Sequence, residues 1–205
     1  MNRNAIVWAV WMALISTLFF APPFSPSDLE LVIDTTLFRM GSVDPILIAM
    51  FNLMGLWPLA YGSIMIKHGK GKTPSPYPFF IASFFTGAFA VLPYIAINKK
   101  GNRGIVLKPL EKALTGRVLS VAMGLTGISL TAFAVLFGDL GEFIELWSGS
   151  MFVYVMTADF LVLTLMFPYM MHLDCRVRKC GKGIRFLYLL PLLGPMIYLL
   201  VRPHA

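Results

Sequence analysis

Asp159 is the residue of this sequence whose position most needs a chemical explanation. It is the only charged residue in the apolar run 151–171. An acidic side chain near the middle of a membrane span costs about 2.5 to 3.5 kcal/mol on insertion scales, so it has to face other helices or water. Two roles fit this position: a proton, ion or substrate site, or a hydrogen-bonded structural contact in which the acid is protonated.

Three further polar residues fall at a depth similar to that of Asp159. At the helical rise of about 1.5 Å per residue, Asn52 lies about 10 Å from the 98–117 side, Thr86 and Ser129 about 16 Å and Asp159 about 18 Å. We therefore expect a polar layer near the membrane midplane.

The segment His172-x-Asp174-Cys175-x4-Cys180 is a second candidate for chemistry. It holds four residues of metal-binding type within nine positions, but their spacing matches no established zinc signature. We interpret the cysteines as two thiols without a metal or redox role. Gly71-Lys72-Thr73 imitates the end of a phosphate-binding loop, but position 66, where the motif needs glycine, is Ile66. The sequence predicts no catalytic residue, no metal and no cofactor, and it disfavours an enzyme.

The elements that position these residues are apolar helices. The chain of 205 residues is 58% hydrophobic and 13% charged, with a mean hydropathy of +0.76, whereas soluble domains carry about 25% charged residues. A spanning helix needs about 20 apolar residues. We predict an all-α, polytopic transmembrane bundle of about six helices that forms one integral membrane domain over 1–205. The predicted spans are 5–21, 45–66, 79–97, 118–137, 151–171 and 186–201.

Other patterns refine this picture. Ser27 and Glu30 form an S-x-x-E capping box, which predicts an interfacial helix over 28–39. The sixth segment is short and contains prolines, so we expect it to be kinked. Small residues recur at packing distance, as in Ser120, Gly124 and Gly127, and allow helices to approach closely.

The distribution of Lys and Arg leaves two topologies open. If all six segments span, twelve Lys and Arg residues lie on one side of the membrane and five on the other, and both termini lie outside. If 79–97 instead enters the membrane and returns at Gly87 or Pro93, these residues divide fifteen to two and the amino terminus lies inside. We favour six spans, because an apolar run of this length is more often a plain helix and a re-entrant backbone needs shielding from lipid.

Two loops form a basic face next to the membrane in either topology. Such a face fixes orientation and attracts anionic lipids, and it can also dock an acidic partner protein. Short basic loops beside apolar runs do not indicate nucleic-acid binding. The residues that represent this face are Lys99, Lys100, Arg103, Arg176, Arg178 and Lys179.

Three stretches resemble patterns in uncharacterised polytopic membrane proteins of cyanobacteria and plant plastids. They are Phe51-Asn-Leu-Met-Gly-Leu-Trp-Pro58, Gly87-Ala-Phe-Ala-Val-Leu-Pro-Tyr94 and Leu190-Pro-Leu-Leu-Gly-Pro195. The resemblance covers about half of the chain and brings no catalytic residue with it. It implies a bacterial inner membrane or a thylakoid-type membrane.

Three functions are compatible with these observations. The first, which the missing catalytic motifs favour, is a non-enzymatic assembly factor or subunit of a membrane complex, bound to another membrane protein or to a second copy of itself. The second is a small transporter or proton-coupled permease centred on Asp159. The third is a membrane enzyme acting on a lipid or quinone, with Asp159, His172 and Asp174 as its acid–base groups.

Overall fold

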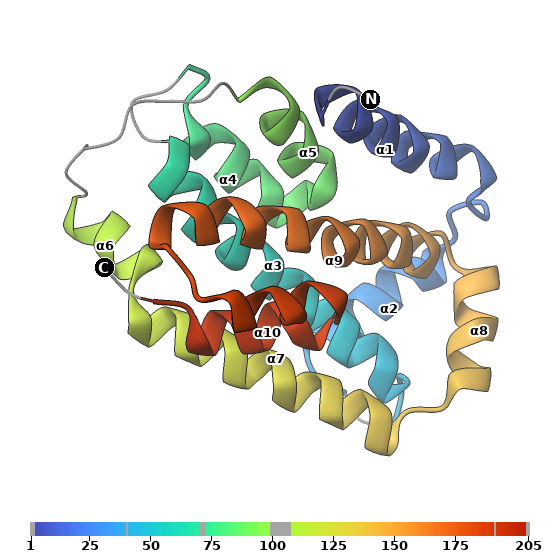
Figure 1. Cartoon of the computed structure of the whole chain (residues 1–205). Helices are drawn as coiled ribbons and strands as arrows, with labels where there is room; N and C mark the ends of the chain where they lie inside the picture. The colour runs from blue at the N-terminus through green and yellow to red at the C-terminus, as the bar shows by residue number, and fades with distance from the viewer. Residues whose placement is uncertain (1–2, 40, 70–72, 99–107, 191, 204–205) are drawn as a thin grey trace.

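The computed structural model describes residues 3–39, 41–69, 73–98, 108–190 and 192–203 (Figure 1). Every regular element in these ranges is a helix. Three helical stretches are long and apolar enough to cross a membrane, namely Pro45–Gly69, Pro109–Phe137 and Met151–Arg176. The prediction of an all-helical protein is confirmed, and the three helices fit a membrane protein. Six separate spans are not confirmed.

α1, α3, α7 and α9 correspond to the predicted spans 5–21, 45–66, 118–137 and 151–171, and α2 corresponds to the predicted interfacial helix. The elements in chain order are α1 (Arg3–Thr17), the 3-10 helix η1 (Leu18–Phe20), α2 (Pro26–Thr36), α3 (Pro45–Gly69), α4 (Pro76–Thr86), α5 (Ala88–Ile97), α6 (Pro109–Thr115), α7 (Arg117–Phe137), α8 (Leu140–Gly149), α9 (Met151–Arg178), the 3-10 helix η2 (Lys182–Leu189) and α10 (Leu193–Val201).

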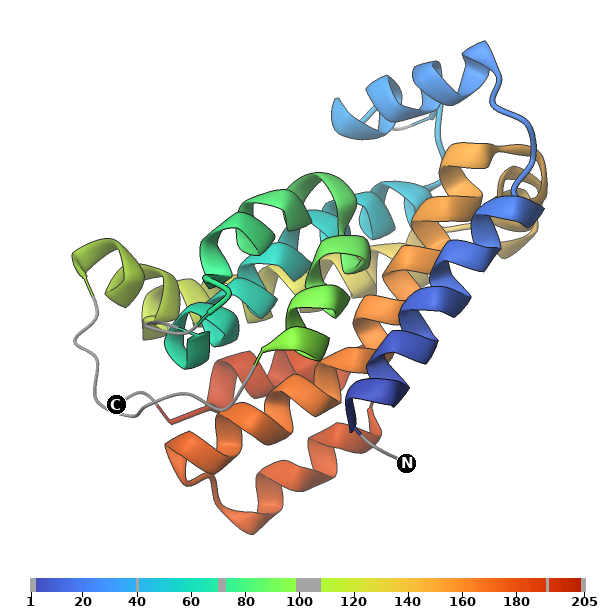
Figure 2. The ribbon, with the colours of Figure 1, turned by 90° about the horizontal axis from the view of Figure 1, so that it is seen from above.

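The start of α2 differs from the predicted capping box. The helix begins at Pro26, with Ser25 as its N-cap, and the Asp28 carboxylate accepts a 2.8 Å hydrogen bond from the Ser25 N–H. Proline is favoured at the first helical position because its missing N–H would have no partner there. The helix therefore starts two residues before the position that the Ser27 pattern predicts. Figure 2 shows α2 standing out from the side of the bundle.

The predicted third span, 79–97, is two helices and not one. α4 ends at Thr86, and the next residue, Gly87, has φ of +50° and ψ of −123°, which reverse the chain so that α5 returns beside α4. The Phe79 and Tyr94 rings, from the first half of α4 and the last half of α5, lie 5.3 Å apart. The segment therefore reverses within the bundle at Gly87, one of the two turns named for the alternative topology, because this backbone conformation is open to glycine alone. Pro93 stays within α5.

The predicted sixth span, 186–201, also folds back on itself. η2 leads away from the end of α9, and α10 returns beside it, so that Gly194 lies against the backbone of Leu187 with no room for a side chain. Arg202, just after α10, contacts Asp174 near the end of α9. The kink expected in this segment is thus a complete reversal, and neither arm is long enough to cross a membrane.

The molecule has two ends of opposite charge. α3 begins after Asp44 and ends after Lys67, while α7 runs the other way, from Arg117 to a point just before Asp139. Both hairpins begin and finish at the basic end. This end carries Lys67, Lys108, Lys112, Arg117, Arg176 and Lys179, whereas the acidic end carries Asp28, Glu30, Asp34, Asp44, Asp139, Glu142 and Glu145.

The two halves of the chain repeat the same order of elements in the same direction. Each half has a helix that runs toward the acidic end, a short helix at that end, a long helix that runs back and a hairpin. α1 packs on α5 in the first half, and α7 packs on α10 in the second (Figure 1). α3 and α9 meet between the halves. There the buried rings of Trp57 and Phe167, each followed by a proline inside its helix, lie 5.2 Å apart.

The small residues of α7 form the surface on which the second hairpin packs. A side chain at Gly124 would collide with Leu200, and one at Gly127 would collide with Met196. Both contacts come from α10. The close helix approach expected from this spacing is therefore confirmed.

Cysteine labelling tests the re-entrant form of the first hairpin. In a background with both native cysteines changed to serine, we expect Ser75→Cys and Gly181→Cys to react with an impermeant maleimide from the same side of the membrane. Ser148→Cys, in α8, should react from the opposite side, since α7 and α9 separate the two ends. Labelling of positions 75 and 181 from opposite sides would show that the 76–97 segment crosses the membrane.

Candidate functional site

Asp159 lies where the first hairpin reverses. Its Oδ1 atom accepts a 2.7 Å hydrogen bond from the backbone N–H of Ala88, the first residue of α5, and the residue is only 4% exposed. The first N–H groups of a helix have no partner inside that helix, and the helix dipole favours an electronegative group beside them. Asp159 is therefore an N-cap for α5 that is supplied by α9.

Gly87 makes room for this contact. A Cβ atom at this position would overlap the Asp159 carboxylate, and the positive φ would be strained for any other residue. The glycine is thus required twice, by its backbone conformation and by its neighbour.

The other residues of the expected polar layer are bonded within their own helices or exposed. Asn52 donates to the Ile48 carbonyl at 2.8 Å, and Thr86 donates to the Ala82 carbonyl at 3.0 Å. Ser129 is exposed on α7. Within the described part of the chain, no hydrogen bond joins any of the three to Asp159.

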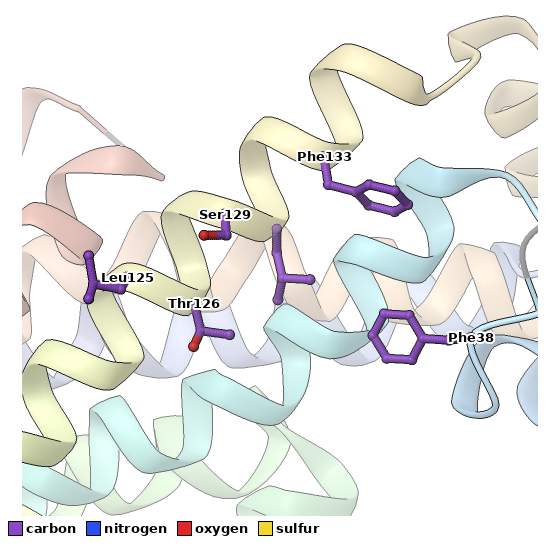
Figure 3. Close-up of a pocket in the computed structure, with 6 residues that line it drawn as sticks. Phe38, Leu125, Thr126, Ser129 and Phe133 are labelled. Atoms are coloured by element: carbon purple, nitrogen blue, oxygen red, sulfur yellow. The ribbon is translucent and has the colours of Figure 1, made fainter.

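Ser129 instead lines an open groove along α7 (Figure 3). The groove has a volume of about 390 Å³, and Phe38, from the segment after α2, faces α7 across it. Thr126 and Ser129 place two exposed hydroxyls in this otherwise apolar surface. The lining residues are Phe38, Leu125, Thr126, Ser129, Leu130 and Phe133.

Among the described residues, the most extensive polar contact surrounds Asp174, at the basic end. Its Oδ2 atom accepts hydrogen bonds of 2.8 Å from Arg178 Nε and from the Tyr198 hydroxyl, and Arg202 Nη1 lies 3.5 Å away. His68 Nε2 lies 3.1 Å from Oδ1. We call these five residues the anchor cluster. The carboxylate is completely buried.

Arg202 extends the anchor cluster to two more helices. Its guanidinium donates to Ser63 Oγ in α3 at 3.1 Å and to Ser120 Oγ in α7 at 2.5 Å. Arg178 donates to the Pro203 carbonyl at 2.6 Å. The cluster thus ties the chain after the second hairpin to α3, α7 and α9.

Of the basic residues that the sequence assigns to a membrane-proximal face, the structure exposes some and buries one. Arg176 and Lys179 are exposed, as expected for a basic face, but Arg178 turns inward because the Asp174 carboxylate is one helical turn away. Lys99, Lys100 and Arg103 lie outside the described residues.

The sequence contained one local signal of the anchor cluster. Asp174 and Arg178 stand four residues apart at the end of an apolar helix, which is the spacing of a helical ion pair. The remaining partners, His68, Tyr198 and Arg202, are far away along the chain, so no local pattern links them to Asp174.

Cys175 and Cys180 form a disulfide with a Cα–Cα distance of 4.9 Å. The prediction of two free thiols is therefore wrong. Cys175 belongs to the last turn of α9, and the chain then turns through Lys179, which has a left-handed backbone with φ of +54°. This turn brings the two cysteines together.

Carboxylates also hold the acidic end together. Asp28 accepts hydrogen bonds from the Ser150 hydroxyl and the Phe152 N–H, at the start of α9. Asp44 accepts bonds of 2.7 Å from the N–H groups of Ile46 and Asp139. The short helices are thereby fastened to the opposite half of the chain.

The stability that Asp28 contributes at the acidic end depends on pH. Burial raises the pKa of Asp28, but hydrogen bonds from Ser150, Ser25 and Phe152 outweigh it, so the pKa lies below its ordinary value. The stabilisation is complete above about pH 4 and is lost as the pH falls through the folded-state pKa. We expect Asp28→Asn to lower the free energy of unfolding at pH 7 by about 1 kcal/mol, which is measured as a lower melting temperature in detergent. The difference from the parent should shrink below about pH 4, and a difference that grows in acid would contradict this role.

Comparison of the chain with known protein families, with curated proteins and with solved structures finds no match in any of the three.

Proposed function

We propose that this protein is a non-enzymatic subunit or assembly factor of a membrane complex. The observation that supports it is the use of the buried carboxylates. Asp28, Asp44, Asp159 and Asp174 each accept hydrogen bonds that join different segments of the chain. Acids in a membrane protein are retained at a cost, for structure or for function. In this protein, the structural contacts of the four acids are a sufficient reason for their presence.

The enzyme hypothesis gains little from the positions of its acid–base groups. Asp159 and His172 are thirteen residues apart on one helix, which is about 20 Å along the axis. Asp174 is fully buried beneath its own partners. General acid–base catalysis needs groups within hydrogen-bond reach of a common substrate, and these three do not converge.

We assign the partner to the groove between Phe38 and α7. In hydrocarbon, the hydroxyls of Thr126 and Ser129 can hydrogen bond only to the backbone of α7 or to a polar group brought by another molecule. A transmembrane helix supplies such a group, and hydroxyls between helices contribute to their association. An acyl chain alone supplies none.

Site-specific photo-crosslinking in the native membrane tests this proposal. A photoreactive residue at Ser129 should give one discrete product with another membrane protein, which mass spectrometry then identifies. The matched control is Leu165, an exposed residue of α9, which should yield no discrete protein product. Products that are indistinguishable at the two positions, or none at either, would contradict the proposal. A product between two copies of the chain would replace a foreign partner with self-association.

A proton-coupled transporter is the second candidate. It is favoured by the break in the first hairpin, since transporters built from repeats place their sites at broken helices near the midplane. Asp159→Asn keeps an oxygen that accepts the Ala88 N–H but cannot release a proton. In proteoliposomes, a structural cap predicts that a pH gradient decays equally with parent and variant. Loss of a parent-specific proton flux in a normally folded variant would favour the transporter.

A further inference from the structure

The disulfide Cys175–Cys180 is on the face of the molecule where a permanent disulfide is least expected. It lies at the basic end, which the positive-inside rule places on the cytoplasmic side. Thiols on that side are kept reduced, and the disulfides found there in most organisms are transient, catalytic or redox-sensing. The chain has no other cysteines, so the acidic end carries none.

The surroundings of the pair favour thiol exchange. Arg176 and Lys179, which lie between the two cysteines in the sequence, are both exposed. All ten acidic residues of the chain are described, and none of them is exposed at the basic end. Positive neighbours stabilise thiolates, which are the species that react in exchange. Both cysteines are partly exposed.

The pair is also coupled to the anchor cluster. Cys175 directly follows Asp174, and its Sγ atom lies 3.9 Å from the Tyr198 hydroxyl, which donates to the Asp174 carboxylate. The Cys180 N–H bonds to the Cys175 carbonyl at 3.1 Å. The disulfide therefore closes the turn that connects the end of α9 to the second hairpin.

We propose that Cys175–Cys180 is a reversible redox site whose reductant is a dithiol protein of the thioredoxin type, and that reduction loosens the second hairpin. One thiolate of the reductant attacks the Cys180 sulfur, which breaks the disulfide and releases Cys175 as a thiol after protonation. The second thiolate of the reductant then attacks the mixed disulfide and releases Cys180. Two electrons and two protons pass to the cysteine pair, and the reductant leaves as a disulfide.

Attack at Cys180 follows from the positions of the two sulfurs. Cys175 is held within α9 against Tyr198, whereas Cys180 lies beyond the helix end. The leaving thiolate at Cys175 forms beside the Tyr198 hydroxyl, in a turn that also carries the exposed Arg176 and Lys179. Once the bond is broken, the left-handed backbone at Lys179, a conformation strained for a residue other than glycine, loses its covalent support.

The first experiment measures exchange. The purified protein in nanodiscs is equilibrated with mixtures of reduced and oxidised dithiothreitol, and free thiols are counted by a mass-tagged maleimide. We expect a two-electron transition from no tag to two tags, and complete reduction by catalytic thioredoxin with excess dithiothreitol. Two tags in fully oxidising buffer, or a disulfide that resists reduction until the protein is denatured, would overturn the proposal.

The second experiment measures coupling. Amide hydrogen exchange in α10 should rise several-fold on reduction of the parent, while exchange in α8, at the other end, stays constant. The variant Cys175→Ser/Cys180→Ser should show the faster α10 exchange with or without reductant. Equal exchange in the oxidised and reduced parent would remove the link to the hairpin, and a reductant effect that persists in the double variant would assign it to something other than this disulfide.

Discussion

Replacement of Asp174 by asparagine is expected to lower the free energy of unfolding by about 3 to 5 kcal/mol, because it leaves two buried guanidinium groups without a counter-charge. The asparagine side chain still offers an oxygen that accepts a hydrogen bond, so the loss would come from charge and not from shape. The change is measured by reversible unfolding of the detergent-solubilised protein in SDS, followed by tryptophan fluorescence.

Asp34 provides a matched control for this substitution. Its carboxylate is paired with Arg39 at 2.8 Å, the same distance that separates Asp174 from Arg178, but the Arg39 side chain is 56% exposed. Exposed pairs contribute about 0 to 1 kcal/mol. Asp34→Asn should therefore have little effect, and an equal loss in both variants would show that burial of the anchor cluster does not matter.

A double variant separates charge from packing. Asp174→Asn/Arg202→Gln removes one carboxylate and one guanidinium together, so it should be more stable than Asp174→Asn alone. This follows because a single buried charge without a partner is the costly state. If the second substitution only adds to the loss, then Arg202 stabilises the protein through its contacts with Ser63 and Ser120 and not through Asp174.

The sequence was sufficient for the long helices and insufficient for the hairpins. α3, α7 and α9 are apolar over the length of a membrane, and this length alone predicts them. The 79–97 segment is equally apolar, so hydropathy treats it as a span. What reverses it is the backbone of Gly87. The sequence offered Gly87 and Pro93 as points of return in the less favoured topology, but nothing in it showed that either would outweigh the length of the apolar run.

The same distinction applies to the polar sites. The energetic cost of an acid in a span identified Asp159, but not its partner, because that partner is the backbone N–H of Ala88 in another helix. The anchor cluster was missed because its residues come from α3, α9, α10 and the chain after α10. Contacts of this kind depend on how the helices pack, and neither hydrophobic periodicity nor local residue spacing predicts them.

Two acidic residues of α9, Asp159 and Asp174, give the hairpins a common physical explanation. A helix that returns halfway leaves backbone groups inside the membrane that lipid cannot satisfy. The first hairpin meets this need with Asp159, which accepts a hydrogen bond from the Ala88 N–H at its turn, a group with no partner inside α5. The second hairpin is held at its C-terminal end, where Tyr198 and Arg202 bond to Asp174. Each hairpin thus depends on an acid of α9.

Replacement of Gly87 by alanine should damage the first hairpin severely. The positive φ costs about 1 to 2 kcal/mol for a residue other than glycine, and the overlap with the Asp159 carboxylate adds about 1 to 3 kcal/mol. We therefore expect a loss of about 2 to 5 kcal/mol in the free energy of unfolding, measured in SDS as for the Asp174 variant.

Gly55→Ala is the control for Gly87→Ala, because Gly55 lies inside α3 and a Cβ there would meet no atom within 4 Å. Alanine in an exposed helical position should be neutral or stabilising by up to about 1 kcal/mol. Amide hydrogen exchange then locates the damage, which should appear in α4 and α5 while α7 stays protected. If Gly87→Ala matches Gly55→Ala in stability and the α5 N–H groups remain protected, the turn tolerates a side chain, and Asp159 is not the group that holds it closed.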